Sequence, residues 1–191
     1  MLEHYLALPE RYYAQDYFYS FPGHFKHIPV KARFLNVGCG RASSLLDYPN
    51  AQGIDFNPQL VSLWETQGIG DRCSLVDIAD GLPWDAEAFE WTVSVDFLEH
   101  LQPEVVEGAV DELLRVASAG RHVIDLLNQS AYRGPNGENL HPSAQTKRFW
   151  LDVFLSAGLQ ESDFSCWQLG RYLYLSYGDT WERGQRLIEE L

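Results

Sequence analysis

The chain of 191 residues lacks several features, each of which would assign it to a large class of proteins. It has no apolar run of membrane-spanning length, so we expect no membrane-embedded part. It has no long cluster of lysine or arginine, and 27 acidic against 14 basic residues give a formal net charge of −13. Because that field repels phosphate backbones, nucleic acid is disfavoured as a partner.

Cysteine is also scarce. Cys39, Cys73 and Cys166 are odd in number and widely spaced, and they match neither a metal-binding pattern nor a disulfide framework. The first residues show neither the basic nor the apolar region of a secretory signal. We therefore expect a cytoplasmic protein. The sequence shows no internal repeat or linker, and 46% hydrophobic residues suit a globular core, so residues 1–191 are expected to form one domain.

The clearest local pattern lies in residues 34–43, where a short apolar segment of strand type breaks into a glycine-rich turn before a helical pattern. Gly38 and Gly40 permit a sharp turn and a close ligand approach, because neither carries a Cβ. Free N–H groups of the following helix would face the ligand. This order is typical of nucleotide-like pockets in α/β sheets, although a plain turn after a buried strand is the alternative.

An acid strengthens the ligand-binding interpretation. Asp55 lies 15 positions after Gly40, at the end of the next short apolar segment. An acid at the tip of a second strand can accept hydrogen bonds from both ribose hydroxyls of an adenosine.

The remaining patterns alternate strands with helices. Strands are expected at residues 73–76, 91–95 and 122–127, and helices are expected to begin at Pro58 and Pro103, the second ending at Gly120. A helix over 149–157 precedes two strands, 163–169 and 171–177, whose tight link at Gly170 requires antiparallel pairing. The fold class is therefore α/β, a doubly wound, seven-stranded sheet that is mostly parallel, with an antiparallel C-terminal strand and helices on both faces.

We also predict structural features at both ends of the chain and in one loop. Residues 1–30 are rich in aromatics and predict an N-terminal helical lid over the ligand pocket; a helix pair packed over the sheet edge is the alternative. Residues 128–142 form a long polar loop, which is usually functional or mobile. Thr180 is expected to cap a last helix.

Taken together, the glycine turn, the acids after successive strands and the final hairpin resemble the class I S-adenosylmethionine-dependent methyltransferases over residues 34–177. The most specific pieces are Val37-Gly38-Cys39-Gly40 and Phe97-Leu98-Glu99-His100. The resemblance implies a Rossmann-like fold, S-adenosylmethionine as cofactor with S-adenosylhomocysteine as product, and methyl transfer to oxygen or nitrogen of a small molecule such as a sugar or natural-product intermediate. A monomer or homodimer is expected.

The resemblance also implies a set of cofactor contacts, one group after each of the first four strands. Gly38, Cys39 and Gly40 would border the methionine part of the cofactor. Asp55 would hold the ribose hydroxyls, and Phe56 would pack beside the adenine. Asp77 would accept from the adenine amino group with Ile78 against the ring, and Asp96 and Phe97 would lie beside the sulfonium and its amino acid end. The alternative for Asp77 is a helix cap, and for Phe97 a core aromatic.

Two positions depart from the family pattern. Asn36 occupies the place of the usual acid before the glycine turn, and Ala42 that of a frequent third glycine. Asparagine still accepts a hydrogen bond, and alanine is tolerated at a helix start. These departures leave open a degenerate cofactor-binding partner subunit, and the negative charge leaves open a methyltransferase acting on a basic protein.

Histidines supply the candidate catalytic groups. His100 and His141 could act as general base towards a hydroxyl acceptor, with a structural role as the alternative for each. As base, His141 would make the rate fall below pH of about 6.5, the unperturbed histidine pKa. A further interpretation joins Asp96, Glu99, His100 and His141 around a divalent cation, with the first three on one face of a helix. The sequence leaves the metal undecided, and we prefer Asp96 as a cofactor contact.

Overall fold

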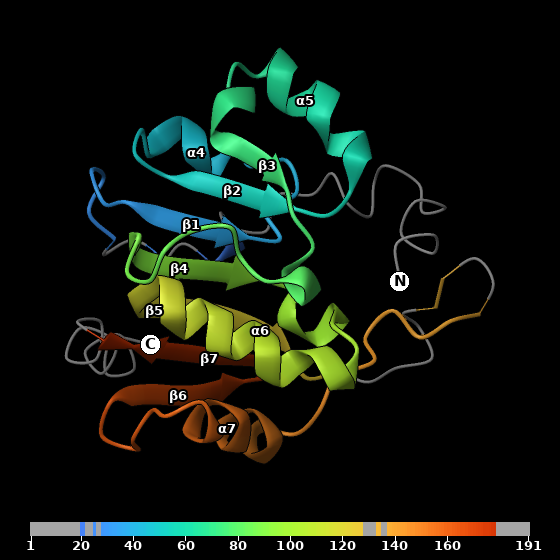
Figure 1. Cartoon of the computed structure of the whole chain (residues 1–191). Helices are drawn as coiled ribbons and strands as arrows, with labels where there is room; N and C mark the ends of the chain where they lie inside the picture. Colours follow the sequence, from blue (N-terminus) through green and yellow to red (C-terminus); the bar gives the residue numbers. More distant parts are fainter. Residues whose placement is uncertain (1–19, 22–24, 26–27, 128–132, 135–136, 179–191) are drawn as a thin grey trace.

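The computed structural model describes residues 20–21, 25, 28–127, 133–134 and 137–178. In this part of the chain seven strands form one sheet in the order β3-β2-β1-β4-β5-β7-β6 (Figure 1). The strands are β1 (Phe34–Val37), β2 (Gln52–Asp55), β3 (Cys73–Leu75), β4 (Phe89–Val95), β5 (Ala117–Asp125), β6 (Phe164–Leu169) and β7 (Tyr172–Tyr177).

Strand directions match the expected fold class. Strands β3, β2, β1, β4 and β5 pair in parallel, whereas β7 pairs antiparallel with both β5 and β6. The turn between β6 and β7 is at Gly170, whose φ of 59° lies in the left-handed region that glycine tolerates. Strand order reverses at β1, where β2 lies on one side and β4 on the other. Open α/β sheets bind ligands at such a switch point, beyond the carboxyl ends of the strands.

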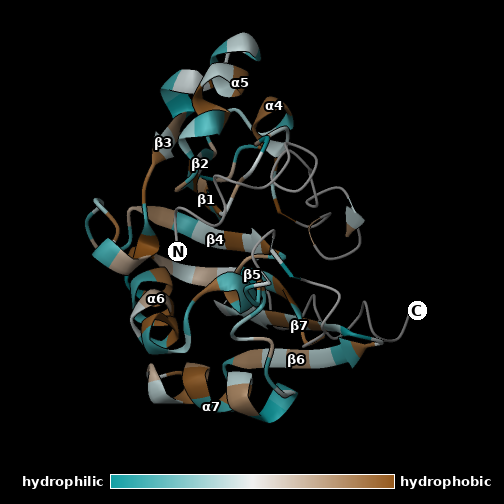
Figure 2. Ribbon diagram, turned by 90° about the vertical axis from the view of Figure 1, so that its right-hand side faces the viewer, coloured by the Kyte–Doolittle hydropathy of each residue, from teal (hydrophilic) through white to brown (hydrophobic). Residues whose placement is uncertain are grey.

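Helices cover both faces of the sheet. They are α4 (Ser44–Asp47), α5 (Val61–Thr66), α6 (Pro103–Val116) and α7 (Lys147–Ser156), with short 3-10 turns η2 (Pro58–Leu60), η3 (Gly70–Arg72), η4 (Ile78–Asp80) and η5 (Leu98–His100). Figure 2 shows α6 and α7 on one side and α4 on the other. Alternation along β1 explains the arrangement, because Leu35 packs in the core under α6 and α7, and Phe34 packs in the core under α4 and α5.

Helix α6 shows how the sequence builds one layer. Pro103 takes a first-turn position, where its missing N–H costs nothing, and Val106, Val110 and Leu113 recur at helical spacing and are fully buried. The helix ends at Val116, and β5 begins at the next residue with no connecting loop.

The expectation that Gly120 ends this helix is therefore wrong. Gly120 lies inside β5, opposite Tyr177 of β7. A Cβ on Gly120 would come within 2.3 Å of the Tyr177 ring. The glycine is needed for close approach of a neighbouring side chain and not for a helix cap. The expected helix over 149–157 is present as α7, followed by Gly158 with a φ of 105°.

At the N-terminal end, three described residues pack on the α4 side of the sheet. Phe25 and Ile28 are buried there, and the ring of Phe21 packs edge-on against Tyr172 and Tyr174 of β7. Residues 1–19, with the expected lid helix, and the helix expected from Thr180 lie outside the described residues. No helix in the described ranges is long and apolar enough to cross a membrane.

Candidate functional site

The glycine turn after β1 has the backbone that the sequence predicts. Gly38 and Gly40 both have positive φ, 69° and 51°. A Cβ on Gly38 would lie 2.2 Å from the ring of Phe97, so only glycine lets the tip of β4 pack against this turn. Ala42 also has a positive φ, 54°, two residues before α4. The explanation of Ala42 as a residue at a helix start is wrong: the position has the left-handed backbone that glycine prefers.

Asp55 ties the second strand to this turn. Its Oδ2 accepts a hydrogen bond from Gly40 N at 3.0 Å, and its Oδ1 accepts one from Asn57 N, also at 3.0 Å. Burial raises the pKa of Asp55, while the amides that donate to it act in the opposite direction. The amide of Phe56 also acts on this carboxylate, but its two oxygens have about four acceptor sites, so the group can anchor the turn and still accept from a ligand hydroxyl.

The turn has further support that the sequence did not reveal. Trp64 of α5 donates from Nε1 to Gly40 O at 2.8 Å, so both the N–H and the C=O of Gly40 are held. Cys39 is buried, and burial raises the pKa of its thiol well above the usual value. Its side chain fits because the neighbouring strand carries Gly53, where a Cβ would be 2.8 Å from Cys39 Sγ. Cys39 can therefore offer a ligand only its backbone.

Asn36 has a structural explanation. It is buried at the end of β1, and its Nδ2 donates to Ser44 Oγ at 3.1 Å, which joins the strand to the first residue of α4. A carboxylate could not donate this bond, and its charge would be costly to bury.

The other expected cofactor residues lie at the same edge of the sheet. Asp77 follows β3 and accepts a hydrogen bond from Ala79 N at 3.0 Å, which confirms the helix-cap alternative for one of its oxygens. Ile78 is buried in the core on the α6 side. Phe56 follows Asp55 and is half-buried. Phe97 packs against the same core as Ile78, which is the core-aromatic alternative, and also against the glycine turn.

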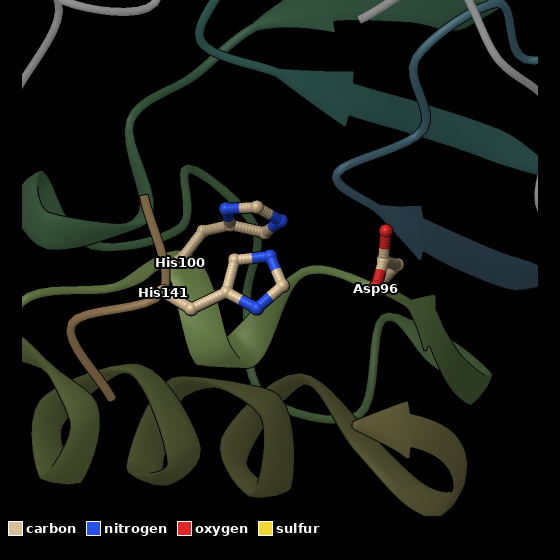
Figure 3. A group of neighbouring side chains, drawn as sticks. All are labelled: Asp96, His100 and His141. Carbon is tan, nitrogen blue, oxygen red and sulfur yellow. The ribbon is translucent and has the colours of Figure 1, made fainter. Parts of the chain in front are cut away.

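The expectation that Asp96, Glu99 and His100 share one helical face is wrong. Asp96 has a φ of 53°, outside any right-handed helix, and only Leu98–His100 form a short 3-10 turn. The residues are nevertheless close. Potential ligand atoms of Asp96, His100 and His141 lie within 4.8 Å of one another, and Figure 3 shows these three side chains. Those of Glu99, Asp125 and His141 also lie within 4.8 Å of one another. His141 belongs to both groups.

Each histidine is fixed in this cluster. The Nδ1 of His100 lies 2.7 Å from Leu140 O, and the His100 and His141 rings meet edge to face with centroids 4.4 Å apart. Burial lowers the pKa of His100 to about 4. Burial, and then the neighbouring His100, lower the pKa of His141 to about 4 as well. Both pKa values lie below the 6.5 of an unperturbed histidine, so both imidazoles are neutral at neutral pH.

Two charged residues complete the cluster and were missed in the sequence. Asp125, at the end of β5, is fully buried and forms an ion pair with Arg171, which follows the β6–β7 turn. Its Oδ2 is 4.0 Å from Nδ1 of His141, and its N–H donates to Oε1 of Glu99 at 2.7 Å. The only sequence signal for Asp125 was its place inside the strand expected at residues 122–127; Arg171 had none.

Comparison with known proteins gives a consistent result. The family model described as "Methyltransferase domain" matches residues 35–124. No curated protein shows significant sequence similarity to the chain. Among solved structures, the DhpI–SAH complex is similar with a TM-score of 0.68 and 13% identity, over 93% of this chain and 95% of that one.

Two other similar structures are longer proteins. A putative O-methyltransferase from Nostoc punctiforme has a TM-score of 0.57 and 14% identity over 82% of this chain. The [4+2]-cyclase SpnF has a TM-score of 0.53 and 22% identity over 71% of this chain. The chain spans only 56% and 53% of their lengths, respectively. At these identities the likeness shows a shared fold. Residues 35–124 match the methyltransferase-domain family model, and the chain has the class I, Rossmann-like fold of the S-adenosylmethionine-dependent methyltransferases.

Proposed function

We propose that the protein binds S-adenosylmethionine and transfers its methyl group to oxygen or nitrogen of a small molecule, such as a sugar or natural-product intermediate. The observation that carries the proposal is the junction of Asp55 with Gly40, which places an acid acceptor directly on a glycine turn at the switch point of the sheet. The family match and the S-adenosylhomocysteine (SAH) complex of DhpI support the same cofactor.

In this proposal the residues after the first four strands hold the cofactor as the family resemblance implies. Gly38, Cys39 and Gly40 border its methionine part through backbone, and Asp55 accepts from the ribose. Asp77, already a helix cap through one oxygen, has a second oxygen for the adenine amino group. Phe56, Ile78 and Phe97 supply apolar contacts, and Asp96 lies beside the amino acid end.

When bound, the cofactor supplies a methyl group on a sulfonium, which needs an aligned nucleophile more than it needs acid–base help. The chain's contribution is then to orient the acceptor and to exclude water. His100 and His141 are the residues proposed to face the acceptor. With pKa values of about 4 they are weak proton acceptors, so orientation is favoured over general-base catalysis as their role.

The first test is calorimetric titration of the purified chain with SAH. One molecule bound per chain, with affinity reduced at least tenfold in Asp55→Ala, supports the proposal. Transfer of labelled methyl groups is then measured to hydroxylated small molecules, to amines and to a basic protein. Transfer only to the protein would replace the small-molecule acceptor with the macromolecular one.

A second candidate function is a partner subunit with a degenerate cofactor site. The left-handed Ala42 favours it, because this strained position lies in the cofactor turn. The SpnF cyclase also illustrates that one fold serves different reactions. The same assays distinguish the two functions, because a folded subunit with a degenerate site would neither bind SAH nor transfer a methyl group.

A further inference from the structure

Two of the three cysteines lie together beside the glycine turn. Cys39 is in the turn after β1, and Cys73 is the first residue of β3. Both pack in the core on the α4 and α5 side of the sheet, where Cys39 is buried and Cys73 is partly buried. All three cysteines of the chain are free thiols in this structure. Thiols from two separate segments therefore meet in one small part of the core.

The residue between these two thiols is a glycine. Strand β2 lies between β1 and β3 (Figure 1), and its Gly53 pairs with Cys73. A Cβ on Gly53 would be 2.8 Å from Sγ of Cys39 and 3.6 Å from Sγ of Cys73. Gly53 is an ordinary strand residue, so the space that it leaves, and not its backbone, explains the glycine. No side chain of β2 separates the two sulfur atoms.

The course of the turn brings Cys39 over β2 and within reach of β3. The N–H of Cys39 donates to Ile54 O at 2.9 Å, and its Cβ is 3.1 Å from the position that a Cβ on Gly53 would take. One strand spacing, about 4.8 Å, separates Gly53 from Cys73. A disulfide joins Cα atoms about 4.4–6.8 Å apart. A small shift of the turn can therefore bring the two sulfur atoms into bonding distance.

The two thiols differ in the way that a disulfide-forming pair requires. A hydrogen bond with the Cys39 thiol lowers the pKa of Cys73, although burial acts in the opposite direction. Burial, and then the contact with Cys73, raise the pKa of Cys39 well above its usual value. The thiolate is the reactive form of cysteine, and Cys73 is also the less buried of the two. Cys73 is therefore placed to attack an oxidant, and Cys39 to resolve the product.

We infer that Cys39 and Cys73 form a reversible disulfide on exposure to a peroxide, and that this bond pulls the glycine turn towards β3 and weakens cofactor binding. The Cys73 thiolate attacks one oxygen of hydrogen peroxide and the O–O bond breaks, which leaves a sulfenic acid and a hydroxide that takes up a proton to become water. The Cys39 sulfur then attacks Sγ of Cys73, the S–O bond breaks, and the hydroxide leaves as water with the Cys39 proton. The two thiols lose two electrons, which the peroxide gains.

The effect on cofactor binding rests on the proposed function. Gly38 and Gly40 flank Cys39, and both have left-handed backbone that few other conformations can replace. Asp55 holds the N–H of Gly40 and Trp64 holds its carbonyl, so a shift of Cys39 towards β3 strains both bonds. A ligand that prefers the reduced turn must, by reciprocity, oppose the disulfide to the same extent. SAH should therefore shift the equilibrium towards the two free thiols.

The test detects the disulfide by mass and needs no methyl acceptor. The full chain is treated with hydrogen peroxide, alkylated, and digested with trypsin without reductant. Cleavage after lysine and arginine places the three cysteines in separate peptides, 34–41, 73–115 and 149–171. We expect peptide 34–41 linked to 73–115, with the mass of the pair lower by two hydrogen atoms, and dithiothreitol should release the two peptides. The mass of the undigested chain establishes that the bond lies within one molecule.

The third cysteine supplies the matched control. Burial raises the pKa of Cys166 to about 11, so Cys166→Ser should form the linked pair as the unaltered chain does. Cys73→Ser should not form it. Peroxide treatment that yields no linked pair, or that links Cys166 in place of Cys73, would overturn the inferred disulfide.

Calorimetric titration with SAH then tests the effect on the cofactor site, and circular dichroism establishes that each sample is folded. The oxidised chain should bind SAH about tenfold more weakly than the reduced chain, and dithiothreitol should restore the affinity. Peroxide should leave the SAH affinity of Cys73→Ser unchanged. Equal affinity of the linked and reduced chains would overturn the effect on the cofactor site. A reduced chain that does not bind SAH would refute the proposed function together with this effect, while the linked peptides would still decide whether the disulfide forms.

Discussion

Replacing Asp55 with alanine should damage both the fold and the cofactor site, because one carboxylate serves both. The substitution removes the bonds from Gly40 N and Asn57 N, each 3.0 Å long. A hydrogen bond to a charged group contributes about 1.5–3 kcal/mol. Burial raises the pKa of Asp55, so part of this gain is offset by the cost of burying the charge. We expect the unfolding free energy to fall by about 2–4 kcal/mol.

The same substitution should weaken SAH binding by about 1–3 kcal/mol, because the ribose hydroxyls lose their acceptor. Asp55→Asn keeps one acceptor oxygen and avoids burying a charge, so its loss of stability should be about half as large. Urea denaturation followed by circular dichroism gives the stability, and calorimetry gives the affinity. Asp111→Ala, at an exposed site on α6, is the control.

The two proposed roles of Asp55, as anchor of the glycine turn and as ribose acceptor, can be refuted independently. An unfolding free energy equal to that of the unaltered chain would refute its role as anchor of the glycine turn. A loss of stability with unchanged SAH affinity would refute its role towards the ribose.

Two further predictions test other parts of the fold. Gly38→Ala should lower the unfolding free energy by about 2–5 kcal/mol and weaken SAH binding, because it adds left-handed strain and a clash with Phe97; a loss below about 1 kcal/mol in urea denaturation would contradict the observed packing. Arg115→Met should lower the unfolding free energy by about 0.5–1 kcal/mol more at pH 7 than at pH 3. Arg115 lowers the pKa of Glu112, so the ion pair's contribution is present above the ordinary carboxyl pKa and is lost on acidification; equal losses at the two pH values would disprove it.

Much of the geometry at the carboxyl edge of the sheet could be predicted because its sequence signals are local. A glycine turn after β1 and single acids after β2, β3 and β4 are visible in short stretches of sequence, and parallel strands bring their ends to one edge. The hairpin at Gly170 was predictable for the same reason, since a tight link allows only antiparallel pairing.

The second cluster depended on contacts between distant residues. The Leu140 carbonyl orients His100 across 40 positions, and Arg171 reaches Asp125 across 46. No local pattern signals either contact. The proximity of Asp96 and His100 was expected, but for a wrong reason, because a left-handed residue and a 3-10 turn replace the supposed helix. The expectation that Gly120 ends a helix was wrong because the Tyr177 ring, which requires a glycine there, lies 57 residues further along the chain.

The direct passage of α6 into β5 has a consequence for how this protein can diversify. With Val116 in the helix and Ala117 in the strand, no residue at that corner is free to take up an insertion. Added chain there would displace a buried helix turn or shift the register of the strand that carries Asp125. Changes in length are accommodated more easily at the opposite edge, where loops already extend between β5 and α7. New acceptor preferences in relatives of this chain should therefore arise through loops at the ligand edge, while the α6–β5 corner keeps a constant length.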